Sequence, residues 1–288
     1  MSNRDWSLVF FTTLAQWSVG LILCFTWLLF FSPEASPVFE TGMRVRNPAV
    51  LALIFIGSAT LSSFLHLGNP ANAPKALNNL SGSWLSREIL AIGIFSASLV
   101  IVLMLGWTGG NPGVLKYPML ISSLCGLTLL WMMIRIYVMP TIPAWNSWYT
   151  PVSFMTTAIC LGLLACLAMQ LAGWVDISGP VALDFTFALT VTLLIEIASA
   201  ISHQLKLIKL DPGMDALVFD RGVFYRVFLF RMALLIIACL AWMTLNHFPE
   251  LLPIDKLPIY LYPLFGLTIA QELIGRLLFY SSYFRIGV

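Results

Sequence analysis

A small set of ionisable side chains interrupts otherwise apolar stretches of the sequence, and these residues carry the chemistry available to the chain. The set consists of His66, Arg87, Glu88, Arg135, Glu196, His203, Arg231, Glu272 and Arg276. If those stretches cross a membrane, each buried charge costs at least about 2.5–3.5 kcal/mol and needs a partner or a function. A histidine that titrates near neutral pH beside a carboxylate can accept protons and hydrogen-bond a polar headgroup. His66 and Glu88 are the candidates for that role.

Two of these positions also have a purely structural interpretation. Glu272 and Arg276 stand four residues apart, so both side chains share one face of a helix. They can form an ion pair that lowers the cost of burying both charges. His66 can serve as a cap or interface histidine at a helix end. The residue types leave both alternatives open.

The composition indicates that a lipid bilayer is the solvent of this chain. Of 288 residues 59% are hydrophobic and 10% are charged, whereas roughly a quarter are charged in an ordinary soluble domain. Apolar runs of about 20 residues recur along the chain, and each is long enough to cross roughly 30 Å of hydrocarbon as a helix. A net charge of +2 without a basic run interleaved with aromatic residues argues against a nucleic-acid-binding protein.

These runs predict an all-α, polytopic membrane protein, with about eight transmembrane helices in a bundle and a single domain over residues 1–288. We place the helices near residues 7–31, 48–67, 88–108, 117–139, 151–172, 181–203, 224–246 and 258–280. Seven aromatic residues fall close to these boundaries, where amphipathic rings prefer the headgroup layer: Trp6, Trp84, Trp107, Trp145, Trp148, Tyr149 and Trp174. The first run is too long for the apolar core of a signal peptide, and we expect it to remain as a spanning helix.

An even number of helices puts both termini on one side of the membrane, which we name side A. The two longer connections, residues 68–87 and 204–223, also belong to side A. All the ionisable residues named above lie toward side A, whereas the half of the bundle toward the opposite side B contains only Asp184. This asymmetry predicts a polar site near one surface of the bilayer.

No metal or cofactor site is predicted in the chain itself. The five cysteines lie inside apolar runs without a C-x-x-C pair, so we expect small buried residues and neither a disulfide frame nor an iron–sulfur motif: Cys24, Cys125, Cys160, Cys166 and Cys239. A b-type haem needs facing axial ligands, and only His66 and His203 form a candidate pair on one side. Walker A, H-E-x-x-H and nucleophile-elbow motifs do not occur, so no hydrolytic chemistry is indicated.

Four segments of the sequence are similar to a known family. They are His66–Pro70, Leu85–Ile89, Trp131–Tyr137 and Glu272–Tyr280, with Pro143–Trp145 and Thr150–Pro151 between the last two. In order, spacing and placement on helices they resemble the membrane anchor subunits of dimethyl sulfoxide reductase and related molybdenum oxidoreductases. The resemblance spans most of the chain, and general hydrophobicity does not produce it.

The resemblance implies a subunit without a redox cofactor of its own, which oxidises menaquinol and passes electrons to an iron–sulfur partner during anaerobic respiration. It implies a four-cluster, ferredoxin-like iron–sulfur subunit and a molybdopterin catalytic subunit as partners. The matching positions tie His66 and Glu88 to quinol oxidation, while Arg87, Arg135, Glu272 and Arg276 bind the headgroup or brace its pocket. Arg87 departs from the family pattern, because related chains can carry a neutral polar residue there. A cation next to Glu88 favours its charged form and is expected to weaken it as a proton acceptor.

The resemblance and the loop charges disagree about orientation. Outside the helices or in their first turn side A carries eight basic residues and side B four: Arg4, Lys75, Arg87, Lys206, Lys209, Arg221, Arg226 and Arg285, against Arg44, Arg46, Lys116 and Lys256. The positive-inside rule alone would place side A in the cytoplasm. The resemblance implies a bacterial inner membrane with termini and quinol site toward the periplasm, and basic loops that dock a partner would distort the count. We therefore assign side A to the periplasm.

Two other classes of function remain open at this stage. A secondary or proton-coupled transporter would place its polar site near the bilayer midplane between broken helices, whereas these polar residues are expected at helix ends. A purely structural anchor would bind lipid in place of quinol. Whether the subunit oxidises quinol or only anchors the complex, the terminal electron acceptor is reduced by the catalytic partner. The identity of that acceptor therefore depends on the partner.

Overall fold

The structure is a computed structural model that describes residues 3–31, 43–64, 75, 77–108, 112–174, 180–210, 220–247 and 257–284. Within these ranges it is entirely helical. The elements are α1 (Asn3–Phe31), α2 (Met43–Phe64), the short 3₁₀ helix η3 (Leu77–Asn79), α4 (Trp84–Trp107), α5 (Pro112–Tyr137), α6 (Tyr149–Leu171), α7 (Pro180–Lys209), α9 (Arg221–His247) and α10 (Leu257–Ser281).

The predicted all-α membrane bundle is confirmed. In the described part of the chain, seven helices are long and apolar enough to cross a membrane. The eighth, α10, is of similar length but carries Gln271, Glu272 and Arg276. Each α-helix corresponds to one predicted span, with ends that differ by a few residues.

Two of those differences have visible local causes. α4 begins at Trp84, four residues earlier than predicted, because the Ser83 side chain caps the helix by accepting from the Ser86 backbone N–H at 3.3 Å. α7 continues to Lys209 because its last turns pack on the connection between α5 and α6. There the Lys206 ammonium donates to the carbonyl oxygens of Pro143 and Asn146, at 2.7 and 3.0 Å.

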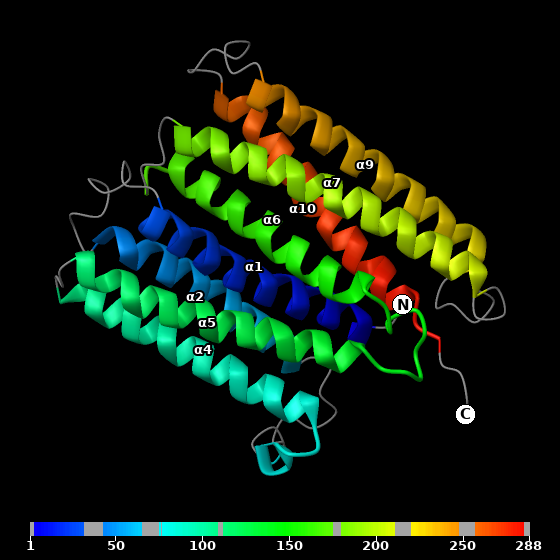
Figure 1. Ribbon diagram of the computed structural model, residues 1–288, viewed down its shortest axis with the longest axis horizontal. Helices are drawn as coiled ribbons and strands as arrows, with labels where there is room; N and C mark the ends of the chain where they lie inside the picture. Colours follow the sequence, from blue (N-terminus) through cyan, green and yellow to red (C-terminus); the bar gives the residue numbers. More distant parts are fainter. Residues whose placement is uncertain are drawn as a thin grey trace.

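α1 and α6 lie in the middle of the bundle (Figure 1). α1 contacts α2, α5, α6 and α10, and α6 also contacts α5, α7 and α10. α2, α4 and α5 form a group on one side, and α7, α9 and α10 form a group on the other. The central pair is the most enclosed, since 72% of each spanning window is buried, against 28% in α2 and 33% in α4 and α9.

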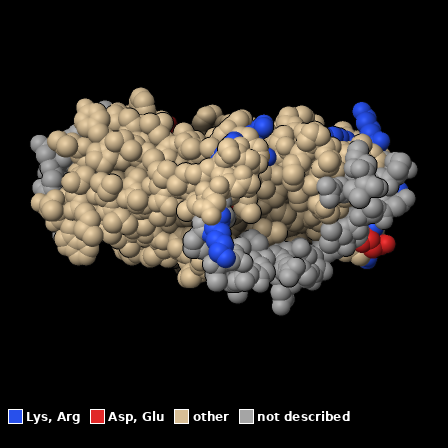
Figure 2. Space-filling view, turned by 90° about the horizontal axis from the view of Figure 1, so that it is seen from below, with Lys and Arg blue, Asp and Glu red and all other residues tan. Residues whose placement is uncertain are grey.

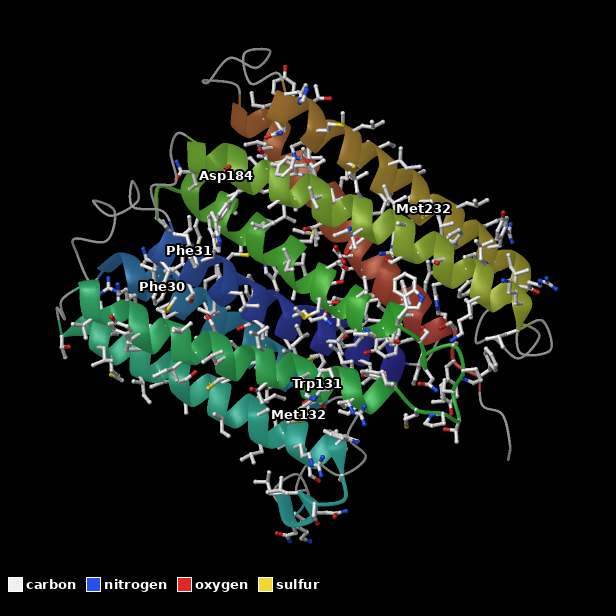
Figure 3. The ribbon with its side chains drawn as sticks, in the orientation of Figure 1. Phe30, Phe31, Trp131, Met132, Asp184 and Met232 are labelled. Atoms are coloured by element: carbon white, nitrogen blue, oxygen red, sulfur yellow. The ribbon has the colours of Figure 1, made fainter. Side chains whose placement is uncertain are left out.

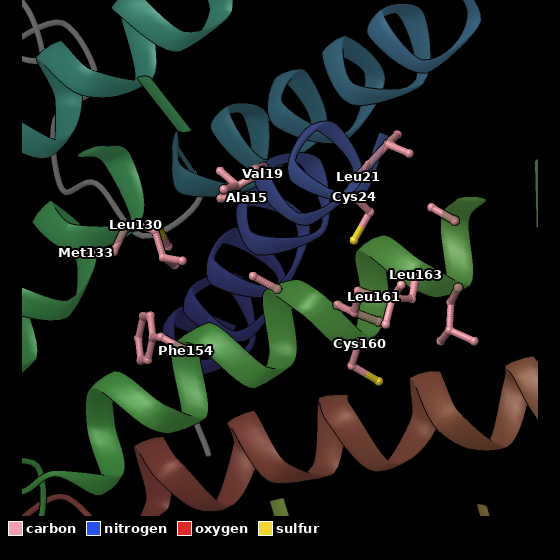
Figure 4. Packing of buried hydrophobic residues seen from close by; sticks show 14 of the residues in the cluster. Ala15, Val19, Leu21, Cys24, Leu130, Met133, Phe154, Cys160, Leu161 and Leu163 are labelled. Carbon is pink, nitrogen blue, oxygen red and sulfur yellow. The ribbon is translucent and has the colours of Figure 1, made fainter. Parts of the chain in front are cut away.

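Glycines bring the backbones of the two central helices into direct contact. A Cβ at Gly20 would lie 1.7 Å from the carbonyl oxygen of Ala158, and a Cβ at Gly162 would lie 2.3 Å from the backbone of Gly20. Small residues spaced four apart allow membrane helices to approach in this way. Around this contact the buried side chains of both helices interlock, among them Val19 and Leu161 (Figure 4).

The helix directions agree with the predicted arrangement of sides A and B. α1 begins and α10 ends at one end of the bundle, and α4 and α9 begin there, so this end is side A (Figure 1). Asp184, near the start of α7, lies at the opposite end with Phe30 and Phe31 (Figure 3). On the face shown in Figure 2 the visible charged side chains lie in the middle and toward side A.

The interfacial aromatic residues are only partly as predicted. Trp107 and Trp148 are strongly exposed near helix ends, as an aromatic belt requires. Trp145 and Tyr149 are instead buried, which corrects their assignment to the headgroup layer. Trp145 stacks on Phe279 and donates its indole N–H to the Phe279 carbonyl at 2.8 Å. The connection before α6 therefore folds back into the bundle.

The Gly20–Gly162 contact predicts a large effect of a single methyl group. Gly162→Ala is expected to destabilise the protein by about 1–3 kcal/mol, because the α1 backbone must move away. Thermal unfolding in detergent measures the change. Gly93→Ala on α4 is the control, since a Cβ there meets no atom within 4 Å. Equal stability of the two variants would contradict the proposed packing constraint.

Candidate functional site

Glu88 is buried at the side A end of α4. The residue is 4% exposed, and its Oε1 atom has no hydrogen-bond partner among the described residues. The carboxyl group lies close enough to the hydroxyls of Tyr137 and Tyr280 to interact electrostatically. A buried acceptor without a protein partner is uncommon and marks a functional candidate. His66, the other predicted catalytic residue, lies outside the described residues.

Arg87 turns away from its neighbour in sequence. Its Nε donates to the Leu80 carbonyl and its Nη2 to the Ser81 carbonyl, both at 2.7 Å. The guanidinium also lies 4.2 Å from the ring centroid of Trp84. Arg87 thus fastens the segment that follows η3 to the start of α4. The predicted effect of its charge on Glu88 stays a prediction.

Arg135 approaches the same indole from α5. Its guanidinium lies 4.8 Å from the Trp84 centroid and 6.0 Å from that of Trp131, and its buried Nε has no hydrogen-bond partner. Trp131 lies on α5 toward side A (Figure 3). Arg87 and Arg135 therefore both contact Trp84, one helical turn before Glu88.

A pair of tyrosines connects this region to α10. The Tyr280 hydroxyl donates to the Tyr137 hydroxyl at 2.9 Å and lies 3.2 Å from Thr12 Oγ1 of α1. Both tyrosines pack edge-on against Trp145. The predicted site did not include them, although they end the Trp131–Tyr137 and Glu272–Tyr280 segments. We name Glu88, Tyr137 and Tyr280 the Glu88 site.

Arg276 lies one turn before Tyr280 and is 2% exposed. Its Nη2 donates to Gln16 Oε1 at 2.8 Å and to Thr157 Oγ1 at 3.3 Å, while Nε and Nη1 have no partner. The guanidinium lies over the ring of Phe154, 4.1 Å from its centroid. An aromatic face stabilises a desolvated cation, so Arg276 is held by neutral groups.

Glu272 and Arg276 do not form the direct ion pair that their spacing allows. Among the described residues they are linked through Thr157, which donates to Glu272 Oε2 at 2.8 Å and accepts from Arg276. Gln271 Nε2 donates to Glu272 Oε1 at 3.0 Å and to Glu196 Oε2 at 3.4 Å. The ion pair found here joins different helices, with Arg231 Nη2 of α9 at 3.6 Å from Glu196 Oε2 of α7. We name Glu196, Arg231, Gln271 and Glu272 the carboxyl cluster.

The carboxyl cluster lies deeper than the sequence suggests. Glu196 is near the middle of α7, and Gln271 and Glu272 are several turns from the end of α10. The expectation that polar residues sit only at helix ends is therefore wrong for these positions. Arg231 connects the cluster to side A, because it also lines a pocket with His203, Tyr149 and Phe228.

His203 has neither a ligand nor a hydrogen-bond partner in the described part of the chain. Its ring stacks on Tyr149 with 4.0 Å between centroids, and both ring nitrogens are unpaired. Its predicted alternative as a haem ligand requires His66, which lies outside the described residues. Across the described residues, no group of three His, Cys, Asp or Glu side chains lies close enough to hold a metal ion. All five cysteines are free; four are buried and Cys125 is half-buried.

Comparison with known proteins identifies the family. The family model for the DMSO reductase anchor subunit (DmsC) matches residues 1–282. The chain belongs to the DMSO reductase anchor subunit family. As a member of the DmsC family it is a multi-pass membrane protein, in agreement with its helices.

Relatives within the DmsC family cover nearly the whole sequence. An anaerobic dimethyl sulfoxide reductase subunit of Escherichia coli (strain K12) is 28% identical over 299 residues, which cover 99% of this chain and 97% of the relative. The anaerobic dimethyl sulfoxide reductase protein YnfH of the same strain is 28% identical over 291 residues with the same coverage. An anaerobic dimethyl sulfoxide reductase subunit of Haemophilus influenzae (strain ATCC 51907 / DSM 11121 / KW20 / Rd) is 33% identical over 163 residues, which cover 56% of this chain and 57% of the relative.

A glycine of this DmsC-family protein makes room for the inter-helix ion pair. A Cβ at Gly275 of α10 would lie 2.5 Å from the Arg231 guanidinium carbon. Gly275 lies between Glu272 and Arg276 in the sequence of α10. Because Gly275 has no side chain, Arg231 of α9 can reach Glu196 of α7. Reasoning from sequence missed both Gly275 and Gln271.

Gly275→Ala is therefore expected to push Arg231 away from Glu196 and to lower stability by about 1–3 kcal/mol. Gly266→Ala on the same helix is the control, because its Cβ would meet no atom within 4 Å. Thermal unfolding of both variants in detergent provides the measurement. A Gly275→Ala protein as stable as the control would show that Arg231 is not held in this position.

Proposed function

We propose that this anchor subunit binds menaquinol at the Glu88 site, oxidises it, and passes the electrons to an iron–sulfur partner subunit. The supporting observation is the buried Glu88 carboxyl, whose Oε1 has no protein partner and which interacts electrostatically with the paired hydroxyls of Tyr137 and Tyr280. A quinol headgroup presents hydroxyl groups, which are the donors that such an acceptor requires. The site lies toward side A, where a lipid-soluble headgroup can meet a docked partner.

Each side chain has a distinct role in this proposal. Glu88 takes a proton from a quinol hydroxyl, and His66 is a second acceptor by resemblance. Arg276, which interacts electrostatically with both tyrosine hydroxyls, stabilises the developing negative charge of the headgroup. Arg135 braces the pocket through Trp84. Glu272 supports Arg276 through Thr157 and does not contact the headgroup.

The electrons leave the chain for a partner, because quinol oxidation also releases two electrons. The partners proposed are a four-cluster, ferredoxin-like iron–sulfur subunit and a molybdopterin catalytic subunit, in which the terminal acceptor is reduced. No redox cofactor of its own is assigned to this chain. The relatives named as chains of dimethyl sulfoxide reductase support membership of such a complex.

We assign the chain to a bacterial inner membrane, with side A and both termini toward the periplasm. In that orientation the iron–sulfur subunit docks on side A over the longer connections, and its contacts explain the basic residues there. A transporter function is not proposed, since the family match is to an anchor subunit.

Glu88→Gln is expected to lower menaquinol-linked reduction by about 10²–10⁴-fold, because the amide keeps the shape of the carboxyl but cannot accept the proton. The assay compares turnover with a menaquinol analogue and with reduced viologen, which delivers electrons directly to the partner subunits. Viologen-linked turnover and assembly should be unchanged. Asp184→Asn at the opposite end of the bundle is the control and should leave both activities intact. Full quinol-linked turnover in Glu88→Gln would favour a purely structural, lipid-binding anchor.

Arg87 provides a second test, which distinguishes a bracing role of its side chain from an effect of its charge. Arg87→Gln should lower quinol-linked turnover several-fold, because it loses the two hydrogen bonds to Leu80 and Ser81. Arg87→Lys keeps the charge but cannot bond both carbonyls in the same fork geometry, so it should fail similarly. Wild-type turnover in Arg87→Lys with loss in Arg87→Gln would show that the charge, and not the bracing, matters.

A further inference from the structure

Two carboxyl groups lie within hydrogen-bonding reach of each other inside the bundle, and neither contacts the quinol headgroup in the proposed function. Glu196 is 2% exposed and Glu272 is 1% exposed. Both accept from the same Gln271 Nε2, and the two carboxyl groups are close enough to hydrogen-bond directly. They come from α7 and α10, so the contact depends on the fold and not on sequence proximity.

Direct contact between two carboxyl groups requires a proton. Ionised carboxylates are acceptors only and repel each other, so the contact is favourable when one of them carries a proton and donates it to the other. Arg231 balances one negative charge through Glu196. The direct hydrogen-bond partners of Glu272 are the neutral side chains of Thr157 and Gln271. One shared proton fits a pair in which only one carboxyl contacts a cation.

The charged side chains around the pair are cationic. Arg231 of α9, Arg276 of α10 and Cys160 of α6 interact with it; Tyr149 of α6 interacts with both arginines and His203 of α7 with Arg231, while α1 contributes the neutral Gln16. The two arginines limit the pair to one proton, because a second would leave both cations without a negative partner.

A pocket toward side A lies next to the pair, with Arg231 between the pocket and Glu196. His203 lines it, is 8% exposed and has two unpaired ring nitrogens. Arg231 lines the same pocket and contacts Glu196 on its inner side. The free volume for a water-sized sphere is about 10 Å³, which is on the order of a single water molecule. An unpaired imidazole beside such a volume is suited to exchange a proton with one water.

We propose that Glu196 and Glu272 bind one exchangeable proton between them, and that this proton reaches side A through the pocket at His203. Its role rests on the proposed function. Glu88 interacts with Tyr137 and Tyr280, and both interact with Arg276 beside Glu272. When Glu88 takes a proton from quinol, the site loses a negative charge, so the pair releases its proton to water and becomes two carboxylates. The pair takes the proton back when Glu88 is deprotonated again.

Infrared difference spectroscopy of the intact, resting complex tests the shared proton. The wild-type minus Glu272→Gln spectrum should contain the carbonyl band of a protonated carboxylic acid. Because sharing needs both groups, Glu196→Gln should lose the same band. Asp184→Asn is the control and should retain it, whereas Glu88→Gln, which removes the same negative charge as protonation of Glu88, should weaken or lose it. A difference spectrum without a carboxylic-acid band would overturn the proposal, as would retention of the band in Glu196→Gln.

Glu272→Asp covers the case in which neither glutamine variant assembles. It keeps a carboxylic acid and should retain the band at a shifted frequency. An unshifted spectrum in that variant would show that Glu272 does not hold the proton. The measurement needs no quinol, so it is independent of turnover. Normal quinol-linked turnover in Glu88→Gln would sink the proposed function while leaving the shared proton standing.

Transfer of the complex into D₂O tests the route through the pocket. His203→Phe keeps the stacking on Tyr149 but removes both nitrogens, so the isotopic shift of the band should develop about tenfold more slowly than in wild type. Asp184→Asn should exchange at the wild-type rate. Wild-type exchange in His203→Phe would remove His203 from the route and overturn that part of the proposal.

Discussion

The arrangement of the bundle depends on the backbone contact between α1 and α6 at Gly20 and Gly162. These two helices separate the α2–α4–α5 group from the α7–α9–α10 group, and they also supply the side chains that connect the groups. Thr12 and Gln16 of α1 bond residues of α10, and Thr157 of α6 bonds both Glu272 and Arg276. These polar side chains lie one to two turns from Gly20 or Gly162, so the glycine contact helps to position the groups that bond α10.

Buried charge is handled in two ways in this protein. Arg276 and Arg231 lie among aromatic faces, amides, a hydroxyl and one carboxylate, which offset part of their desolvation cost, while Nε and Nη1 of Arg276 stay without a partner among the described residues. At Glu88 a carboxyl oxygen is buried without a partner. Low-dielectric surroundings make such an atom costly, and a binding partner that supplies a donor recovers that cost.

The helices, their direction and the one-sided placement of charge follow from apolar length and helix parity, which are properties of the sequence. The contacts between those charges do not. The spacing of Glu272 and Arg276 suggested a pair, yet Thr157, more than a hundred residues away in sequence, stands between them. Trp145 and Tyr149 looked interfacial because they are near helix ends, but their connection folds inward. Gly275 carries no chemical signal at all, since its role is to leave space for Arg231 on another helix.

The polarity of α10 also has a consequence for how the protein enters the membrane. Gln271, Glu272 and Arg276 make this helix a poor substrate for insertion by hydrophobicity alone. It follows every other helix in synthesis, so Glu196, Arg231, Thr157 and Gln16 are already made when α10 leaves the ribosome. A helix that meets prepared hydrogen-bond partners at the translocon can enter laterally with its polar face covered. The order of helices along the sequence is therefore itself a solution to a problem of biogenesis.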